Sequence, residues 1–277
     1  MTLIGTHIRP GIRPLVRPRI RTGAAVAVVT GLLLGTAACT ADEPADTAAK
    51  APAGGALPEP VKTPAATPDE TPAATPAAPA ELPGLGPRTR ATIKPDTHQV
   101  VVVTGEGADS NRSRVRLYER HPSLGWRPAA DEWAARNGHK GWAERHVRGD
   151  LRTPVGTYRL TDAGGKLANP GTALPYDRNR GVLYTARGTN FEDKPKAGAL
   201  DYVVAINYNR VAGRPPYDFT RPMGAARGGG IWFHVSHDGG TEGCVGLPRG
   251  RMKELMRKLK PTAKPVTVMG PAESLAR

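Results

Sequence analysis

A long Ala-, Pro- and Thr-rich stretch limits where this chain of 277 residues can build a hydrophobic core. From Thr40 to Arg90 the sequence has almost no aromatic or β-branched apolar residues, as in TPAATPDETPAATPAAPAELPGLGP. Such a segment cannot bury enough apolar surface to fold, and it favours extended polyproline conformations. We therefore predict a disordered, semi-rigid linker over residues 39–90. Residues 91–277 are then one folded domain, long enough to bury its own core.

Residues 1–38 have the features of an export signal. An arginine-rich opening precedes the apolar run GAAVAVVTGLLLGTAA, which is shorter than the ~20 apolar residues of a comfortable spanning helix. Thr36-Ala37-Ala38-Cys39 resembles a bacterial lipobox, with Thr36 in place of the usual leucine. These features predict a lipoprotein-type signal peptide and lipidation at Cys39, and an uncleaved membrane anchor is the alternative.

This leader also predicts where the protein works. The chain is expected to be exported and lipid-anchored at the cell membrane, facing the cell wall, or to be secreted if Cys39 is not lipidated. The formal net charge is +14, and most of it lies from Ala91 onward. A domain this basic favours polyanionic partners: nucleic acid, an anionic membrane or the bacterial cell wall. Because an exported protein rarely meets nucleic acid, we expect the anionic cell wall as partner, and no nucleic acid.

The apolar runs of the folded part are short and are separated by turn residues. Residues 98–104 and 113–118 predict a hairpin, and 129–136 a short helix or turn. Further strands are expected within 149–160, 202–207, 228–235 and 266–269. Residues 161–200 predict a long loop of the kind that covers a site, and Arg249 to Leu259 an amphipathic helix. The predicted fold class is mainly β with sandwich-like mixed sheets, one amphipathic helix near the C-terminus and long loops.

The stretch from Gly228 to Pro248, GGGIWFHVSHDGGTEGCVGLP, brings together a thiol and two imidazoles. His234 ends an apolar strand, and Cys244 follows ten positions later, after a glycine-rich turn. A turn-back of this length can bring the imidazole within hydrogen-bond reach of the sulfur. Since a thiol is weakly reactive until a base removes its proton, we predict Cys244 as a nucleophile and His234 as its base.

Residues around Cys244 supply further candidates. Gly243, Thr241 and Ser236 are the candidate substrate or oxyanion groups, because a glycine turn lets backbone amides approach a reacting carbonyl closely. Glu242 would oppose thiolate formation if it pointed inward, so we expect it to be a solvent-facing turn residue.

A metal site is the competing interpretation of the two histidines. His234, His237 and Asp238 could be ligands, but positions three apart on a strand point to opposite faces. No further histidine or glutamate stands at a recognisable zinc-site spacing. We therefore expect no metal, and we expect His237 to be a surface or loop histidine.

Three motifs together resemble the L,D-transpeptidase family with the YkuD-type catalytic domain. They are Thr153-Pro154-Val155-Gly156-Thr157-Tyr158, a strand ending in His234, and Thr241-Glu242-Gly243-Cys244. The resemblance runs from about His98 to Gly270. Within that family, the chain is most similar to an actinobacterial exported branch. Two segments carry this similarity: Ala205-Ile206-Asn207-Tyr208-Asn209-Arg210 and Gly228-Gly229-Gly230-Ile231-Trp232.

This resemblance implies an acyltransferase acting on peptidoglycan stem peptides. Cys244 matches the acyl-accepting nucleophile and His234 its base. The thiolate would attack the carbonyl of the third stem residue, release the terminal D-amino acid and pass the acyl group to a neighbouring stem amine, with no metal or organic cofactor.

The chain departs from the family pattern at Glu242, where the family has a second histidine, at Gly246, where it has Arg or Asn, and in a shorter His-to-Cys spacing. Two alternatives therefore stay open: a carboxypeptidase or hydrolase on the same residues, and a non-catalytic wall-binding lipoprotein.

Overall fold

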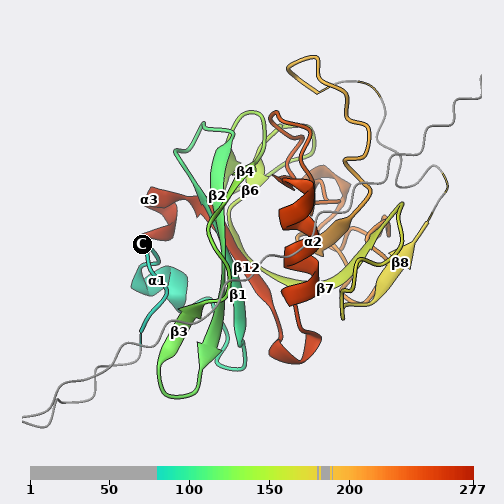
Figure 1. Cartoon of the computed structure of the whole chain (residues 1–277). Coiled ribbons are helices and arrows are strands. Elements are labelled where there is room, and N and C mark those ends of the chain that lie inside the picture. Colours follow the sequence, from blue (N-terminus) through green and yellow to red (C-terminus); the bar gives the residue numbers. More distant parts are fainter. Residues whose placement is uncertain (1–79, 180, 182–187, 189) are drawn as a thin grey trace, which may run out of the picture. The chain divides into compact units, whose positions relative to one another are not determined.

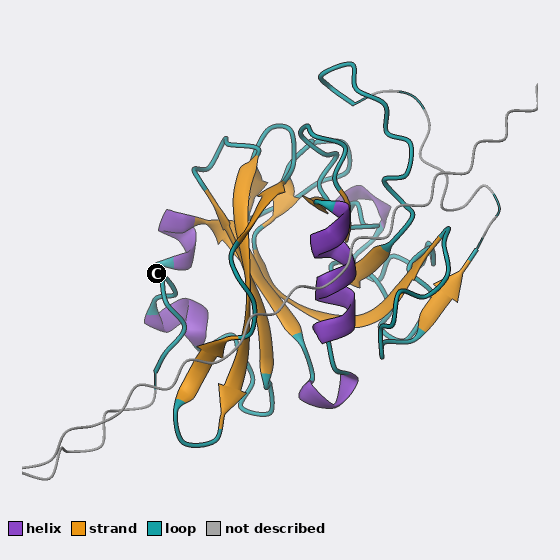
Figure 2. Cartoon of the chain, in the orientation of Figure 1, coloured by secondary structure: helices purple, strands orange, loops and turns teal. Residues whose placement is uncertain are grey.

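The structure of the chain is a computed structural model, and it describes residues 80–179, 181, 188 and 190–277. The predicted signal peptide, the lipidation site Cys39 and most of the predicted linker lie outside the described residues. The described part is mainly β, with a single helix of more than one or two turns, so the predicted fold class is confirmed (Figures 1 and 2). Among these residues, no helix is long and apolar enough to cross a membrane.

Ten strands of the described residues form one mixed sheet that closes on itself. Its path runs β1-β12-β7-β9-β10-β11-β4-β2-β3, β8 pairs with β7, and β1 also pairs with β2, which makes the sheet barrel-like. The strands are β1 (Gln99–Gly105), β2 (Arg112–His121), β3 (Gly125–Pro128), β4 (Trp133–Arg136), β7 (Gly156–Gly165), β8 (Tyr176–Arg178), β9 (Val203–Ile206), β10 (Trp232–Val235), β11 (Val245–Leu247) and β12 (Val266–Pro271). A second, two-stranded sheet holds β5 (Trp142–Ala143) and β6 (Thr153–Pro154).

Helix α2 (Arg249–Lys258) supplies apolar side chains to the main core. Met252, Leu255 and Met256 are fully buried and pack in the same cluster as residues of β1, β2, β4, β9, β10 and β11. The helix ends where the buried side chain of Gln99 accepts a hydrogen bond from the Lys260 N–H and donates one to the Lys258 carbonyl. The amphipathic helix predicted from the sequence is thus confirmed, and it directly follows β11, which begins one residue after Cys244.

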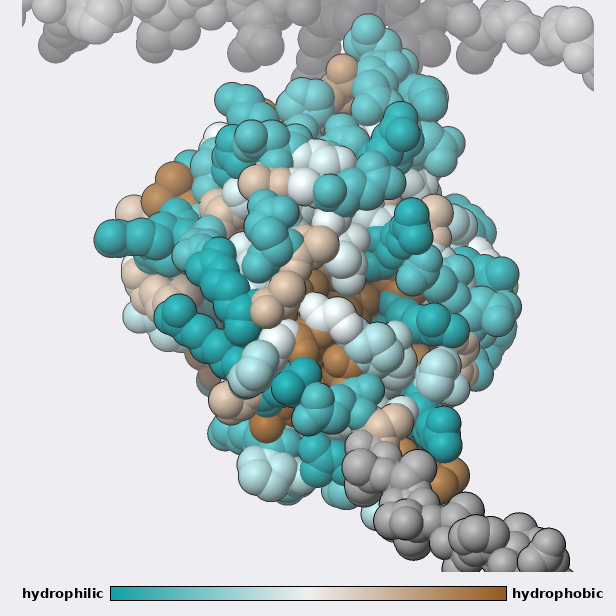
Figure 3. Space-filling view, turned by 90° about the vertical axis from the view of Figure 1, so that its left-hand side faces the viewer, coloured by the Kyte–Doolittle hydropathy of each residue, from teal (hydrophilic) through white to brown (hydrophobic). Residues whose placement is uncertain are grey.

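The opposite side of β1 and β12 is covered by a smaller core. Leu82, Leu85 and Leu275 are buried there, next to α1 (Pro87–Arg90) and within α3 (Ala272–Leu275). The packed region therefore includes the last residues of the stretch that the sequence assigned to the linker. Figure 3 views the molecule from the side where α1 and α3 lie in Figure 1, and shows mainly hydrophilic residues with hydrophobic ones gathered toward the middle.

Other elements follow the sequence pattern in part. The predicted hairpin is confirmed, since β1 and β2 pair in antiparallel fashion over seven residue pairs. The helix or turn expected at 129–136 is wrong, because Trp133–Arg136 is strand β4, paired with β2 and β11. The long loop expected from Thr161 is shorter than predicted, because β7 continues to Gly165 and β8 pairs with it in parallel.

Candidate active site

The neighbouring strands β10 and β11 position the predicted base and nucleophile. They pair in parallel, with His234 opposite Gly246. Since side chains alternate along a strand, this register puts Cys244 level with Trp232 and on the same face of the sheet as His234. The sequence predicted that the chain would reverse direction between His234 and Cys244. This is wrong, because β10 and β11 are parallel and the chain crosses over from the end of one to the start of the other.

Thr241 anchors this crossover and shapes the turn that presents the thiol. Its N–H donates to the Asn137 carbonyl (2.9 Å), and its carbonyl accepts from the His139 N–H (2.8 Å). Its hydroxyl donates to the Cys244 carbonyl (2.7 Å) and accepts from the Gly243 N–H (3.1 Å). Thr241 is therefore a buried turn-former, and the Gly243 N–H is engaged within the turn.

Gly243 is required here by its backbone conformation. Its φ is 137°, a region that side-chain-bearing residues rarely adopt. A β-carbon at this position would also lie 3.0 Å from the Arg152 carbonyl oxygen and 3.2 Å from Ile231 Cδ1. Any larger residue would displace the turn that holds Cys244.

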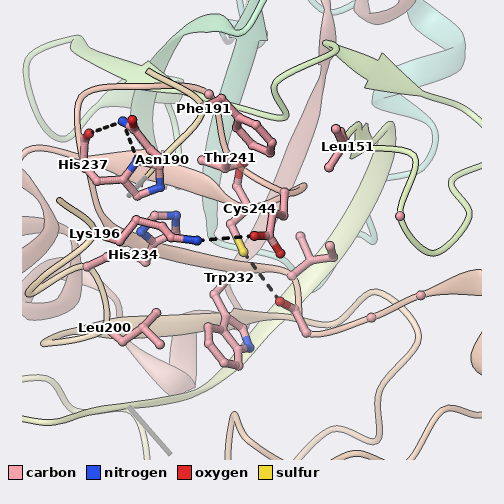
Figure 4. Close-up of a pocket in the computed structure, with 18 of the residues that line it drawn as sticks. Leu151, Asn190, Phe191, Lys196, Leu200, Trp232, His234, His237, Thr241 and Cys244 are labelled. Carbon is pink, nitrogen blue, oxygen red and sulfur yellow. Dashed lines mark hydrogen bonds and ion pairs between the residues drawn. The ribbon is translucent and has the colours of Figure 1, made fainter. Parts of the chain in front are cut away.

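The sulfur of Cys244 lies against backbone groups at the start of β10 and just before it. The thiol donates to the carbonyl of Gly230 (3.5 Å), and its side chain is partly buried (Figure 4). Burial raises the pKa of Cys244 to about 12; the backbone N–H of Trp232 opposes this and the charge of Glu242 adds to it. The thiol is therefore protonated at neutral pH until a base acts on it.

His234 is oriented for such a role. It is 4% exposed, and its Nδ1 lies 2.8 Å from the carbonyl oxygen of Val235. Because a carbonyl only accepts hydrogen bonds, the proton sits on Nδ1 and leaves Nε2 with a free electron pair. Burial lowers the pKa of His234 to about 4, so the imidazole is neutral at rest.

These two pKa values predict how Cys244 responds to pH. Alkylation by iodoacetamide needs the thiolate, so its rate constant should rise about tenfold per pH unit from pH 7 to 9. The rate is followed by mass spectrometry of the intact Cys39→Ala chain, in which Cys244 is the remaining cysteine. A plateau beginning near pH 7 would indicate a resting thiolate–imidazolium pair and would contradict the neutral pair described here.

Burial of His234 also predicts a loss of stability in acid. Its folded-state pKa of about 4 lies below the ordinary value of 6.5, so the unfolded chain binds more protons below pH 6.5. Between pH 7 and pH 5 this one group should lower the free energy of unfolding by about 2 kcal/mol. Denaturant titrations of wild type and His234→Gln at both pH values measure the effect; His121→Gln, at an exposed position, is the control. Equal pH dependence in wild type and His234→Gln would contradict the prediction.

The thiol and the imidazole face one cavity of about 470 Å³ (Figure 4). Lys196 and Glu242 form an ion pair at its lining, with 3.5 Å between Nζ and Oε1, and Figure 4 shows Lys196 directed toward Cys244. The Glu242 side chain is 74% exposed, as expected for a solvent-facing turn residue. A ligand in this cavity could therefore contact both the sulfur and the Lys196–Glu242 ion pair.

His237 lies in the loop after β10, as the sequence suggested, but it is half-buried and lines the cavity. Its ring stacks on that of His234, with centroids 5.5 Å apart, and burial lowers its pKa. Asn190 holds it by donating to its carbonyl oxygen (2.7 Å). No pattern in the sequence could have found this contact, because Asn190 lies 47 positions away in a glycine- and proline-rich segment.

The remaining predicted residues are placed outside the reacting centre. Ser236 accepts a hydrogen bond from the Asp238 N–H (3.1 Å) and is not among the cavity-lining residues, so it supports the turn after β10. In the part of the chain that the structure describes, no three His, Cys, Asp or Glu side chains group as metal ligands. The alternative ligand set of His234, His237 and Asp238 therefore finds no support in their positions.

Comparison with known proteins gives one match. The family model described as L,D-transpeptidase catalytic domain (YkuD) matches residues 101–268, more than half of the chain. Neither the curated proteins nor the solved structures gave a match. The matched range contains every strand from β2 to β11, the two histidines of the cavity and Cys244.

Proposed function

Because the chain belongs to the L,D-transpeptidase family with the YkuD catalytic domain, whose activity is on peptidoglycan, we propose that it transfers acyl groups between stem peptides through a thioester on Cys244. The observation that carries this proposal is that a partly buried thiol and a buried imidazole, whose Nδ1 is held by a backbone carbonyl, lie on one face of the sheet and line one cavity. Such a pair is what nucleophilic catalysis by cysteine requires.

In the first half of the reaction, His234 acts as general base. Its Nε2 takes the thiol proton as the sulfur of Cys244 attacks the carbonyl carbon of the third stem residue. The proton then passes to the departing amine of the terminal D-amino acid, the C–N bond breaks, and a thioester remains on Cys244. Since the Gly243 N–H is already bonded to Thr241, the Cys244 N–H is the amide we assign to the developing oxyanion.

In the second half, an amine of a neighbouring stem attacks the thioester. A C–N bond forms, the C–S bond breaks, and the thiolate recovers its proton through His234. If water attacks instead, the same residues give a carboxypeptidase. The outcome depends on which acceptor the cavity admits.

The decisive test of this function is product analysis. The full chain is incubated with tetrapeptide stems, with and without an added acceptor stem, and products are resolved by mass. Release of D-Ala with a new link between two third residues supports transpeptidation, and release without a link identifies a hydrolase. The absence of both products, with unchanged binding to wall sacculi, would support a non-catalytic wall-binding protein.

We also propose that the chain is exported and lipid-anchored, with a leader over residues 1–38, a linker from residue 39 and the catalytic domain at its C-terminal end. The support is the apolar leader, the lipobox-like Thr36-Ala37-Ala38-Cys39, and a basic domain suited to the anionic cell wall. Cells grown with radiolabelled palmitate should label wild type and not Cys39→Ala. Equal labelling of the two would contradict lipidation at Cys39.

A further inference from the structure

A second imidazole lines the same cavity and is held by a carboxylate. His146 is 3% exposed, and its Nδ1 lies 2.9 Å from Oδ1 of Asp150. The carboxylate is itself fixed, because it accepts the N–H of Val147 (2.9 Å) and the N–H of Arg152 (2.9 Å). A carboxylate only accepts, so the nearby Asp150 favours the proton on Nδ1 and leaves the electron pair on Nε2.

The ring of His146 lies against both backbone segments that hold the sulfur. A β-carbon on Gly243, the residue before Cys244, would lie 3.7 Å from its Cε1. A β-carbon on Gly228 would lie 2.8 Å from its Nε2. Gly228 lies two residues before Gly230, whose carbonyl receives the thiol. A residue larger than glycine at position 228 would therefore collide with the ring, whereas a β-carbon at position 243 would be in ordinary van der Waals contact with it, so the ring packs against the residue before the nucleophile.

The groups around His146 suit a base that receives a proton and then gives it up. Tyr208 meets the ring edge-on, with centroids 5.2 Å apart, and its hydroxyl donates to the His146 carbonyl (3.1 Å). Burial lowers the pKa of His146 most; Asp150 and a backbone hydrogen bond with Arg152 raise it, and the charge of Arg227 lowers it. The imidazole is thus neutral at rest, and a carboxylate stands ready to stabilise it once protonated.

The proposed reaction leaves one proton without an acceptor. A stem amine arrives as an ammonium group with three protons, and the amide nitrogen of the product keeps one. One of the other two returns to the Cys244 sulfur through His234, as the first half-reaction requires. The remaining proton must leave before the nitrogen can attack, because an ammonium has no electron pair.

We propose that Nε2 of His146, oriented by Asp150, takes this proton from the incoming acceptor amine, so that the site uses two bases, one for the donor and one for the acceptor. This inference rests on the proposed acyl transfer. The ammonium gives its proton to His146, the free amine attacks the thioester carbon, and His146 releases the proton to solvent after the product leaves.

The test uses His146→Gln in the full chain and separates the two half-reactions. D-Ala release and acylation of Cys244 in a single turnover should stay within about threefold of wild type. Transfer to diaminopimelate, whose amines are protonated at pH 7, should fall at least about 30-fold. Transfer to hydroxylamine, which is largely unprotonated at pH 7, should change little. His121→Gln, at an exposed position, is the matched control.

Three results would overturn the proposal: equal losses with both acceptors, a comparable loss of acylation, or unchanged transfer to diaminopimelate. If the His146–Asp150 pair only supports the fold, the variant should lose transfer to both acceptors equally or should lose acylation as well. Asp150→Asn gives a second variant with the same expected acceptor dependence. If wild type forms no acyl-enzyme at all, the proposed function is wrong. The role of His146 is contradicted only when the acyl-enzyme forms and transfer from it gives one of the three results above.

Discussion

Replacing Cys244 by alanine is expected to lower the rate of D-Ala release and of cross-link formation by at least about 10³-fold. Among the described residues that line the cavity, Cys244 supplies the one thiol, and alanine offers no substitute for forming the thioester of the proposed mechanism. Because the side chain is partly buried and its methylene is kept, the fold should tolerate the change. The measurement is product formation from tetrapeptide stems by the full chain.

The chain supplies its own matched control for this substitution. Cys39→Ala removes the other cysteine, which stands directly after the predicted leader, and should leave activity on soluble stems unchanged. Retention of more than a tenth of the wild-type rate by Cys244→Ala would show that the reaction does not pass through the thiol. Circular dichroism of both variants separates lost chemistry from lost structure.

Replacing His234 by glutamine is expected to lower kcat for D-Ala release by about 10²- to 10⁴-fold, with little change in KM. Glutamine can keep the hydrogen bond to the Val235 carbonyl, but it cannot accept the thiol proton. Since burial raises the pKa of Cys244 to about 12, the uncatalysed ionisation at neutral pH is too unfavourable to replace the base. Steady-state kinetics at pH 7 and pH 9 measure the loss, which should shrink at the higher pH.

His237→Gln is the matched comparison, because the His237 ring stacks on His234 and has no assigned proton transfer. It should lose less activity than His234→Gln, through weaker positioning of the stacked ring. A larger loss in His237→Gln than in His234→Gln would reverse the assignment of the base. A loss in His234→Gln that does not depend on pH would point to damaged packing and not to a missing base.

The sequence was sufficient to predict the elements with strong internal patterns. The run Val100 to Val103 and the alternation in Ser113 to Tyr118 predicted the β1–β2 hairpin, and the apolar spacing around Met252 predicted α2. Each of these signals depends on residues close together in the chain, where periodicity reports which face is buried.

Strand β4 was missed for a physical reason. Trp133–Arg136 is only four residues long, and its alternation of buried and more exposed positions is too short to outweigh the helix-forming alanines around it. Pairing with β2 and β11 decides its conformation, and that pairing is a property of the tertiary structure.

The candidate site was predicted only along its own segment. Cys244 and His234 could be found because only ten positions separate them in the sequence, and the structure places them on one face of the sheet. Asn190 and His146 enter the cavity from segments 54 and 98 positions before Cys244, so no local pattern linked them to the thiol. Ser236 lay close in sequence but turns away into a loop hydrogen bond.

The most direct test of the central claim is acylation of Cys244 by a carbapenem. The strained β-lactam carbonyl of such a compound is attacked by an activated thiol, and the ring-opened adduct stays on the sulfur. The full chain should gain the mass of one carbapenem per molecule, peptide mapping should place it on Cys244, and His234→Gln should form it much more slowly. A chain that gains no adduct, or that gains it at another residue, would contradict the account of Cys244 as the acyl-accepting nucleophile.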